Sequence, residues 1–257
     1  MNADRSQDPK SSGVEPALVG WMVDAQVDFM DPAGRLYVRD LFDETDAGSA
    51  QVIPVLERVL AWMKENCDII VFTGDWHGLE DAEIDPVAPD PAMNTYPPHC
   101  MGRSFDQNER AGAEIIEPLR PVNPLVLTHD STPGDALAVA ARAIAEQRSV
   151  FVRKTKFNVF DGNPGCEAFI AALEKTLARP LQFVVAGIAR DVCMTQAVDG
   201  LLDRSYPVFA LRDATWGLGL EPEETTLARW AERGSVITTH ELDGLSRSLK
   251  NGRTSCA

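Results

Sequence analysis

The sequence lacks a long apolar run, and it has few positive charges. A membrane-spanning helix needs roughly 18 or more consecutive apolar residues, and no stretch of the 257 residues approaches that length. Lysine and arginine together number 24 against 39 aspartates and glutamates, so the net charge is −15. This balance offers no basic face for nucleic acid or for an anionic membrane surface. We therefore expect neither nucleic acid nor a membrane as a partner.

Cysteine is also scarce. The five cysteines are an odd number, scattered from Cys67 to Cys256 without the spacing of a disulfide framework. Such cysteines are typical of reduced, intracellular proteins. The first 16 residues are polar and charged, and they lack the apolar segment of a signal peptide. We expect a cytoplasmic protein in which residues 1–16 form a flexible N-terminal tail.

Apolar runs alternate with helix-period segments along the rest of the chain. Uninterrupted rather than alternating apolar runs predict strands buried on both faces, as in parallel sheets covered by helices. The runs lie at 17–23, 68–73, 124–128, 149–153, 181–186, 207–211 and 235–239, and the helix-period segments at 50–66, 135–147, 164–177, 192–204 and 221–233. We predict a single α/β domain over residues 17–257, a three-layer α/β/α sandwich with a mostly parallel sheet of about six strands. Residues 78–123, rich in proline and aspartate, are expected to form long loops.

Cys193 follows one of these runs at the point where a helix-like segment begins. A thiol at the positive end of a helix dipole is favoured as thiolate, its nucleophilic form. A free cysteine is more often a small buried apolar residue, so this position alone does not establish catalysis.

Other reactive side chains follow the predicted strands at the same end. Asp24 follows the first strand, Asp75 and His77 follow the second, and Lys154 follows the strand at 149–153. Because ligands bind outside the carboxyl ends of parallel strands, we expect these side chains to converge with Cys193 at one edge. There a carboxylate can accept the thiol proton, and an ammonium can lower the pKa of the thiol.

Neighbouring residues compete for two of these roles. Asp28 is a second candidate base, and Arg153 and Lys156 are alternatives to Lys154. We favour Asp24 over Asp28 because only Asp24 directly follows a buried strand.

Asp75, His77 and His99 supply one carboxylate and two imidazoles on predicted loops, a set that suits a divalent metal. The spacing alone is equally compatible with ordinary polar loop residues. The remaining histidines, His129 and His240, fit no ligand pattern and are expected to be structural. Four aromatic residues at the same edge could form the walls of a pocket for a flat substrate: Phe29, Trp76, Tyr96 and Phe157.

Five motifs over about residues 17–240 resemble the nicotinamidase branch of the isochorismatase-like cysteine hydrolases. They are Val23-Asp-Ala-Gln-Val-Asp-Phe29, Gly74-Asp-Trp-His77, Tyr96-Pro-Pro-His-Cys100, Lys154-Thr-Lys-Phe-Asn-Val-Phe160 and Gly187-Ile-Ala-Arg-Asp-Val-Cys193. The resemblance implies a catalytic triad of Cys193 as nucleophile, Asp24 as general base and Lys154. It also implies a cis peptide at Ile188–Ala189, with the backbone N–H groups of Ala189 and Cys193 forming the oxyanion hole.

The same resemblance implies one divalent metal ion per chain, held by Asp75, His77 and His99. Zinc is the first choice, and iron or manganese also suits these ligands. Substrate contacts would come from Phe29 and Tyr96, with Phe157 beside them. A homo-oligomer, dimer or tetramer, is usual in this family.

The implied reaction is hydrolysis of nicotinamide, or of a close aromatic amide such as pyrazinamide, to the acid and ammonia through a thioester. Arg190 stands where the family commonly has threonine, and Tyr96 where tryptophan is usual. The stretch from 122 to 149 is longer than is typical. An alternative substrate is therefore a carboxylated amide or a ureido compound paired with Arg190. A non-catalytic binding protein on the same scaffold is a third hypothesis.

Overall fold

A computed structural model describes residues 14–245. The predicted tail, residues 1–16, lies almost wholly outside this range, and so does the end of the predicted domain. Among the described residues, no helix is long and apolar enough to cross a membrane.

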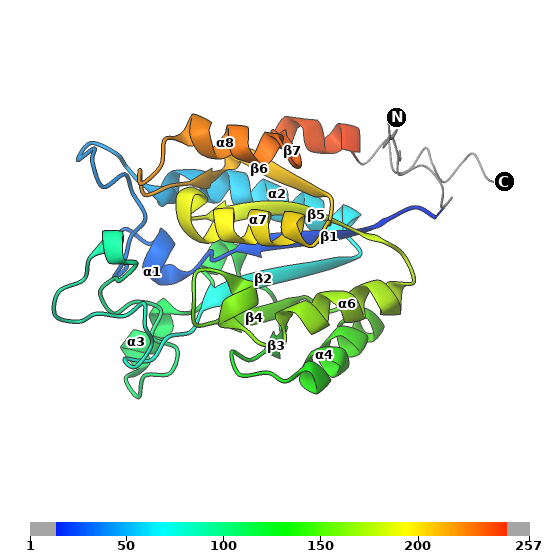
Figure 1. The fold of residues 1–257 in the computed structure, drawn as a ribbon, viewed down its shortest axis with the longest axis horizontal. Coiled ribbons are helices and arrows are strands. Elements are labelled where there is room, and N and C mark those ends of the chain that lie inside the picture. Colours follow the sequence, from blue (N-terminus) through cyan, green and yellow to red (C-terminus); the bar gives the residue numbers. More distant parts are fainter. Residues whose placement is uncertain (1–13, 246–257) are drawn as a thin grey trace, which may run out of the picture.

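Seven strands form one sheet in which every neighbouring pair is parallel. The strands are β1 Ala17–Val23, β2 Ile69–Asp75, β3 Leu125–Leu127, β4 Val150–Lys154, β5 Leu181–Ile188, β6 Val208–Trp216 and β7 Ser235–Ile237. Their order across the sheet is β3-β4-β2-β1-β5-β6-β7 (Figure 1). The predicted three-layer α/β/α sandwich is confirmed, with seven strands in place of about six.

Helices cover both faces of the sheet. They are α1 Val27–Met30, α2 Ile53–Asn66, α3 Gln107–Gly112, α4 Pro133–Glu146, α5 Val159–Gly162, α6 Cys166–Leu177, α7 Thr195–Asp203 and α8 Glu223–Ala231, with 3-10 turns at Ser49–Val52, Pro91–Met93, Glu117–Leu119 and Thr239–Glu241. Apolar side chains of α4, α6, α7 and α8 pack on one face, and those of α2 pack on the other. Each face of the sheet therefore has its own buried cluster.

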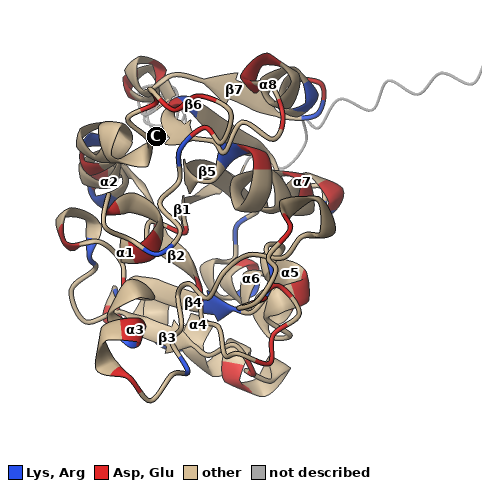
Figure 2. Cartoon of the chain, turned by 90° about the vertical axis from the view of Figure 1, so that its left-hand side faces the viewer, with Lys and Arg blue, Asp and Glu red and all other residues tan. Residues whose placement is uncertain are grey.

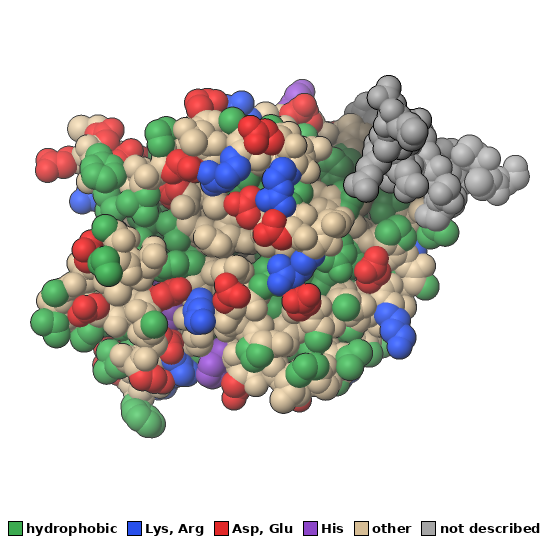
Figure 3. Space-filling view, in the orientation of Figure 1, with side chains coloured by type: hydrophobic (Ala, Val, Ile, Leu, Met, Phe, Trp, Pro, Cys, Tyr) green, Lys and Arg blue, Asp and Glu red, His purple; other side chains and the backbone are tan. Residues whose placement is uncertain are grey.

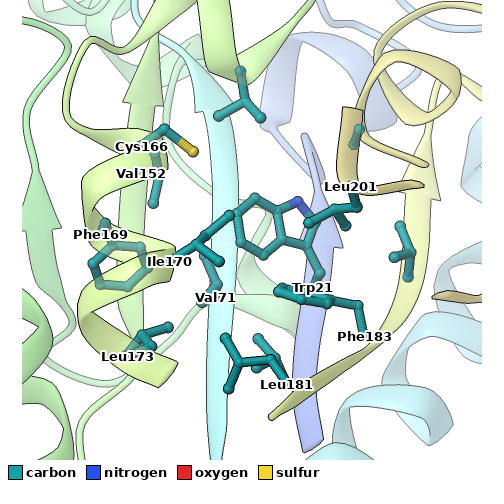
Figure 4. Packing of buried hydrophobic residues seen from close by; sticks show 14 of the residues in the cluster. Trp21, Val71, Val152, Cys166, Phe169, Ile170, Leu173, Leu181, Phe183 and Leu201 are labelled. Carbon is teal, nitrogen blue, oxygen red and sulfur yellow. The ribbon is translucent and has the colours of Figure 1, made fainter. Parts of the chain in front are cut away.

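The larger cluster is centred on β1. Trp21 is fully buried among side chains from β2, β5, α6 and α7, including Val71, Ile170 and Leu201 (Figure 4). Its ring meets Phe183 of β5 edge-on, with 5.7 Å between the ring centroids. Burying aliphatic and aromatic side chains of this kind stabilises the fold by about 1.5–3 kcal/mol each.

Two segments differ from the sequence-based expectation. The loop region 78–123 contains the short helix α3, because the Asp106 side chain caps it by accepting a hydrogen bond from the N–H of Asn108 at 2.8 Å. The helix predicted from residue 192 begins instead with a π-helical turn, Arg190–Met194. In that turn the N–H of Met194 bonds to the carbonyl of Ala189, five residues earlier. Cys193 lies inside this wider turn, before α7.

The carboxyl ends of the strands all lie on the side that carries α1 and α3, opposite the ends of the described chain (Figure 1). Figure 2 shows the molecule from this side, with loops from several crossovers arranged around the strand ends. Side chains that are far apart in the sequence meet here.

Candidate active site

Asp24, Lys154 and Cys193 come together at the carboxyl ends of β1, β4 and β5. The ammonium nitrogen of Lys154 lies 2.9 Å from Oδ2 of Asp24 and 3.7 Å from Sγ of Cys193. All three side chains are buried, and Asp24 adopts a left-handed backbone conformation with φ of 46° directly after β1. A thiol, a carboxylate and an ammonium thus share one buried site.

The competing residues lie elsewhere or are otherwise engaged. Asp28 accepts hydrogen bonds from the N–H groups of Cys100, at 2.7 Å, and Arg35, at 3.1 Å, so it organises loops around the site. Arg153 stacks over the ring of Trp76, 3.5 Å from its centroid. Lys156 is exposed.

The charges of the cluster set the protonation of the thiol. Burial raises the pKa of Cys193 well above its ordinary value, and the Asp24 carboxylate adds to this effect against the opposing charge of Lys154. Burial also raises the pKa of Asp24, although Lys154 opposes it. Burial alone would lower the pKa of Lys154, but the carboxylates of Asp24 and Asp75 raise it. The direction of this shift favours the protonated thiol, whereas the helix dipole alone would favour the thiolate.

Two buried side chains that the sequence analysis missed orient these groups. Thr73 donates a hydrogen bond of 2.6 Å to Oδ1 of Asp24. Gln26 brackets the backbone of Asp75: its Oε1 accepts from the N–H of Asp75 at 2.7 Å, and its Nε2 donates to the carbonyl at 2.8 Å. Gln26 lies within the first motif and Thr73 directly precedes the second, but nothing in the sequence alone indicates these partners.

Asp75, His77 and His99 form a second cluster beside the first. Ligand atoms of the three lie within 4.8 Å of one another, and all three residues are buried. Oδ2 of Asp75 lies 3.7 Å from Nε2 of His77 and 3.9 Å from Nε2 of His99. Oδ1 of Asp75 contacts the Lys154 ammonium, so this carboxylate belongs to both clusters.

The donor atoms of this second cluster fit a metal ion. Nδ1 of His77 pairs with Asp81 at 3.0 Å and Nδ1 of His99 pairs with the carbonyl of Pro97 at 2.7 Å, which leaves each Nε2 directed at the shared space. Oδ2 of Asp75 and Nε2 of His77 are buried and have no hydrogen-bond partner. Buried polar atoms without partners are costly, and a divalent cation would satisfy both.

The protonation of the two imidazoles differs. Burial and the neighbouring His77 lower the pKa of His99 to about 4, so it is neutral near pH 7. Burial alone would lower the pKa of His77, but the neighbouring carboxylates of Asp75 and Asp81 raise it to about 9. A cation would therefore have to displace a proton from His77.

A pocket opens beside Cys193. It is lined by Phe29, Leu36, Val38, Asp75, Tyr96, His99, Phe157, Ala189, Val192, Cys193 and Leu218. Three of the four aromatic residues expected to form its walls do so, and the rings of Tyr96 and Phe157 meet edge-on with 5.6 Å between centroids. Trp76 does not line it and packs against Arg153 instead.

The aliphatic side of this pocket was not foreseen. Leu36, Val38 and Leu218 come from irregular loops, which carry no periodic signal in the sequence. Arg190 lies outside the pocket: its guanidinium pairs with Glu223 at 3.1 Å and lines a separate acidic cavity with Asp40 and other aspartates.

The backbone around Cys193 has the form that the sequence resemblance implies. The peptide bond between Ile188 and Ala189 is cis. Ala189 and Cys193 both line the pocket.

The model of the Isochorismatase domain matches residues 16–242. The chain belongs to the isochorismatase family. It therefore has the scaffold of the isochorismatase-like hydrolases, a superfamily of enzymes that act on small molecules. A search of curated protein sequences gives no match.

Solved structures of the family share the fold at low sequence identity. Pyrazinamidase of Pyrococcus horikoshii in complex with zinc is 21% identical over 87% of this chain and 99% of its own, with a TM-score of 0.57. Nicotinamidase from Bacillus subtilis is 18% identical over 86% and 98%, with a TM-score of 0.56. N-carbamoylsarcosine amidase from Thermoplasma acidophilum is 16% identical over 86% and 96%, also with a TM-score of 0.56.

Proposed function

We propose that this protein is a metal-dependent cysteine amidohydrolase that converts nicotinamide, or a close aromatic amide such as pyrazinamide, to the carboxylic acid and ammonia. The observation that carries the proposal is the meeting of Asp24, Lys154 and Cys193 beside an aromatic-lined pocket, with Asp75, His77 and His99 adjoining it.

In the proposed reaction the Asp24 carboxylate accepts the thiol proton as Sγ of Cys193 attacks the amide carbon. The carbonyl oxygen becomes an oxyanion, which the backbone N–H groups of Ala189 and Cys193 stabilise. Asp24 then gives its proton to the departing nitrogen, so ammonia leaves and a thioester remains. The same carboxylate next accepts a proton from a water molecule that attacks the thioester, which yields the acid and restores the thiol.

Lys154 keeps this carboxylate in place. Its ammonium pairs with both Asp24 and Asp75 and so offsets the repulsion between two buried carboxylates that lie side by side. It also lies within reach of the charge that develops on Sγ of Cys193.

Asp75, His77 and His99 would hold the metal, and the bound ion would supply a Lewis-acid attachment point for a heterocyclic nitrogen. Fixing one end of a flat ring in this way limits the poses in which the amide can lie against Cys193.

The pocket favours an uncharged ring over a carboxylated substrate. Phe29, Tyr96 and Phe157 offer faces and edges for a ring, and the remaining wall is aliphatic. The cation that would pair a carboxylate, Arg190, is already paired with Glu223 away from this pocket.

Ammonia release from a panel of amides tests the proposal. The panel contains nicotinamide, pyrazinamide and N-carbamoyl compounds, each assayed before and after chelation and after metal is restored. We expect turnover of the two aromatic amides, loss on chelation and recovery with zinc, iron or manganese. His99→Ala should abolish this metal-dependent turnover, whereas His129→Ala serves as the matched control. Turnover of carbamoyl compounds alone, or full activity without metal, would contradict it.

A further inference from the structure

Leu218 forms one wall of the pocket although its own stretch of chain has little to hold it there. It is 4% exposed, and it follows the end of β6 in a segment without regular structure. Gly217 and Gly219 flank it, and Gly219 has a positive φ of 76°. Because glycine leaves the backbone free to adopt many conformations, contacts from outside the segment must fix the position of Leu218.

Asp191 supplies those contacts from the turn that carries Cys193. Its Oδ1 accepts a hydrogen bond from the N–H of Leu218 at 2.9 Å, and its Oδ2 accepts one from the N–H of Leu220 at 2.8 Å. Hydrogen bonds to an ionised carboxylate are roughly twice as strong as those between neutral groups. One side chain thus ties the pocket wall to the nucleophile turn, two residues before the thiol.

The same segment is connected to the stretch of chain that carries the rest of the aliphatic wall. The carbonyl of Leu218 accepts a hydrogen bond from the N–H of Leu41 at 2.9 Å. Leu41 lies in the irregular stretch that also places Leu36 and Val38 along the pocket. Asp191 therefore anchors the Leu218 part of the aliphatic wall directly, and one backbone hydrogen bond links that part to the stretch carrying Leu36 and Val38.

We propose that Asp191 is a positioning residue that sets the width of the substrate pocket by holding Leu218, and that Leu218 determines which ring substituents are accepted. The proposal rests on the proposed function in taking this pocket as the substrate site. Asp191 touches neither the substrate nor the reacting atoms in this scheme, and it acts through the wall.

Kinetics of Asp191→Asn, Leu218→Ala and the double variant test this role. The Asn side chain keeps the size of Asp191 but loses one acceptor and the charge. We expect the KM for nicotinamide to rise about tenfold with kcat within about twofold, because the wall loosens while the triad is untouched. The preference for nicotinamide over a ring-methylated nicotinamide should fall about tenfold in both single variants.

The double variant separates this role from a merely structural one. If Asp191 acts through Leu218, then Asp191→Asn should add little once Leu218 is truncated, so the effects are not multiplicative. Asp213→Asn is the matched control, because Asp213 also accepts two hydrogen bonds from a distant segment, from the N–H and hydroxyl of Thr239, and does not line the pocket. Multiplicative losses in the double variant, or unchanged selectivity in Leu218→Ala, would overturn the proposal.

A second readout needs no turnover. Alkylation of Cys193 by iodoacetamide and by a bulkier N-benzyl iodoacetamide, followed by peptide mass spectrometry, measures access to the thiol directly. Asp191→Asn should raise the ratio of the bulky to the small reagent rate about tenfold. If the wild-type protein hydrolyses no amide while this ratio still rises, the proposed function fails and the role of Asp191 stands; an unchanged ratio overturns the role of Asp191.

Discussion

Asp75 is the residue at which the two buried clusters meet. One carboxylate oxygen contacts Lys154, and the other faces His77 and His99. Gln26 fixes the backbone on either side of it with two hydrogen bonds. A change at this residue would disturb both the thiol site and the candidate metal site, whereas a change at His99 would affect the second site directly.

Glu83 is a further buried carboxyl near this junction. It is 9% exposed, its Oε1 accepts a hydrogen bond from the N–H of Phe157 at 2.9 Å, and its Oε2 has no partner. Burial, with a smaller contribution from Asp75, raises the pKa of Glu83 to about 7. The ionised form is therefore disfavoured in the folded protein.

Glu83 should make the metal-free protein less stable as the pH rises. In the unfolded chain its carboxyl has the ordinary pKa of 4.5, whereas in the folded protein burial raises that pKa to about 7. Between these values the folded state binds more protons, so stability is lost with rising pH. Urea unfolding at pH 4.5 and pH 8 should show that the wild type loses roughly 2 kcal/mol relative to Glu83→Gln, which stays neutral. Parallel stabilities for the two proteins would contradict this.

At the scale of elements, the close approach of β1 and β5 builds the site. Gly187 of β5 has a φ of 128°, and a Cβ at this position would lie 2.1 Å from the carbonyl oxygen of Val23. This contact brings the end of β1, and hence Asp24, next to the turn that carries Cys193. Only glycine fits both the backbone conformation and the space.

Replacing Gly187 with alanine should damage both the fold and the activity. The added Cβ would collide with backbone that cannot move aside, and the required φ disfavours any other residue, so we expect a loss of about 3 kcal/mol or more. Gly134→Ala is the matched control, because its Cβ would have only the Thr132 hydroxyl within 4 Å, at 3.6 Å, and a helical position favours alanine. Urea unfolding should separate the two variants, and equal stability would contradict this account of the β1–β5 contact.

At the scale of the whole molecule, the pattern of apolar runs predicted the architecture well. Each of the seven runs forms a strand, and the uninterrupted apolar character correctly indicated a parallel sheet between helical layers. The order of the strands could not be predicted from the residues alone, because it depends on which crossover passes over which face. The π-helical turn was also missed, because the residue types at 190–194 do not distinguish it from the first turn of an α-helix.

The candidate site was predicted where a side chain directly follows a strand. Asp24 directly follows β1, whereas Asp75 and Lys154 prove to be the last residues of β2 and β4. The structure brings all three together with Cys193. Partners such as Thr73 and the Leu218 wall depend on contacts between distant segments, which no local pattern encodes.

The surface carries charges of both signs. On the face shown in Figure 3, acidic and basic side chains are interspersed. Ion pairs among the described residues include Arg229 with Glu221 at 2.7 Å and Arg204 with Glu167 at 3.1 Å.

The central claim is that Cys193 attacks the amide carbon. The most direct measurement is ammonia release from nicotinamide by the metal-loaded wild type, by Cys193→Ala and by Cys67→Ala, a control at the far end of α2. The account predicts wild-type rates for Cys67→Ala and at least a thousandfold loss for a folded Cys193→Ala, since no other nucleophile forms the thioester. A folded Cys193→Ala that retains a rate within tenfold of the wild type would contradict it.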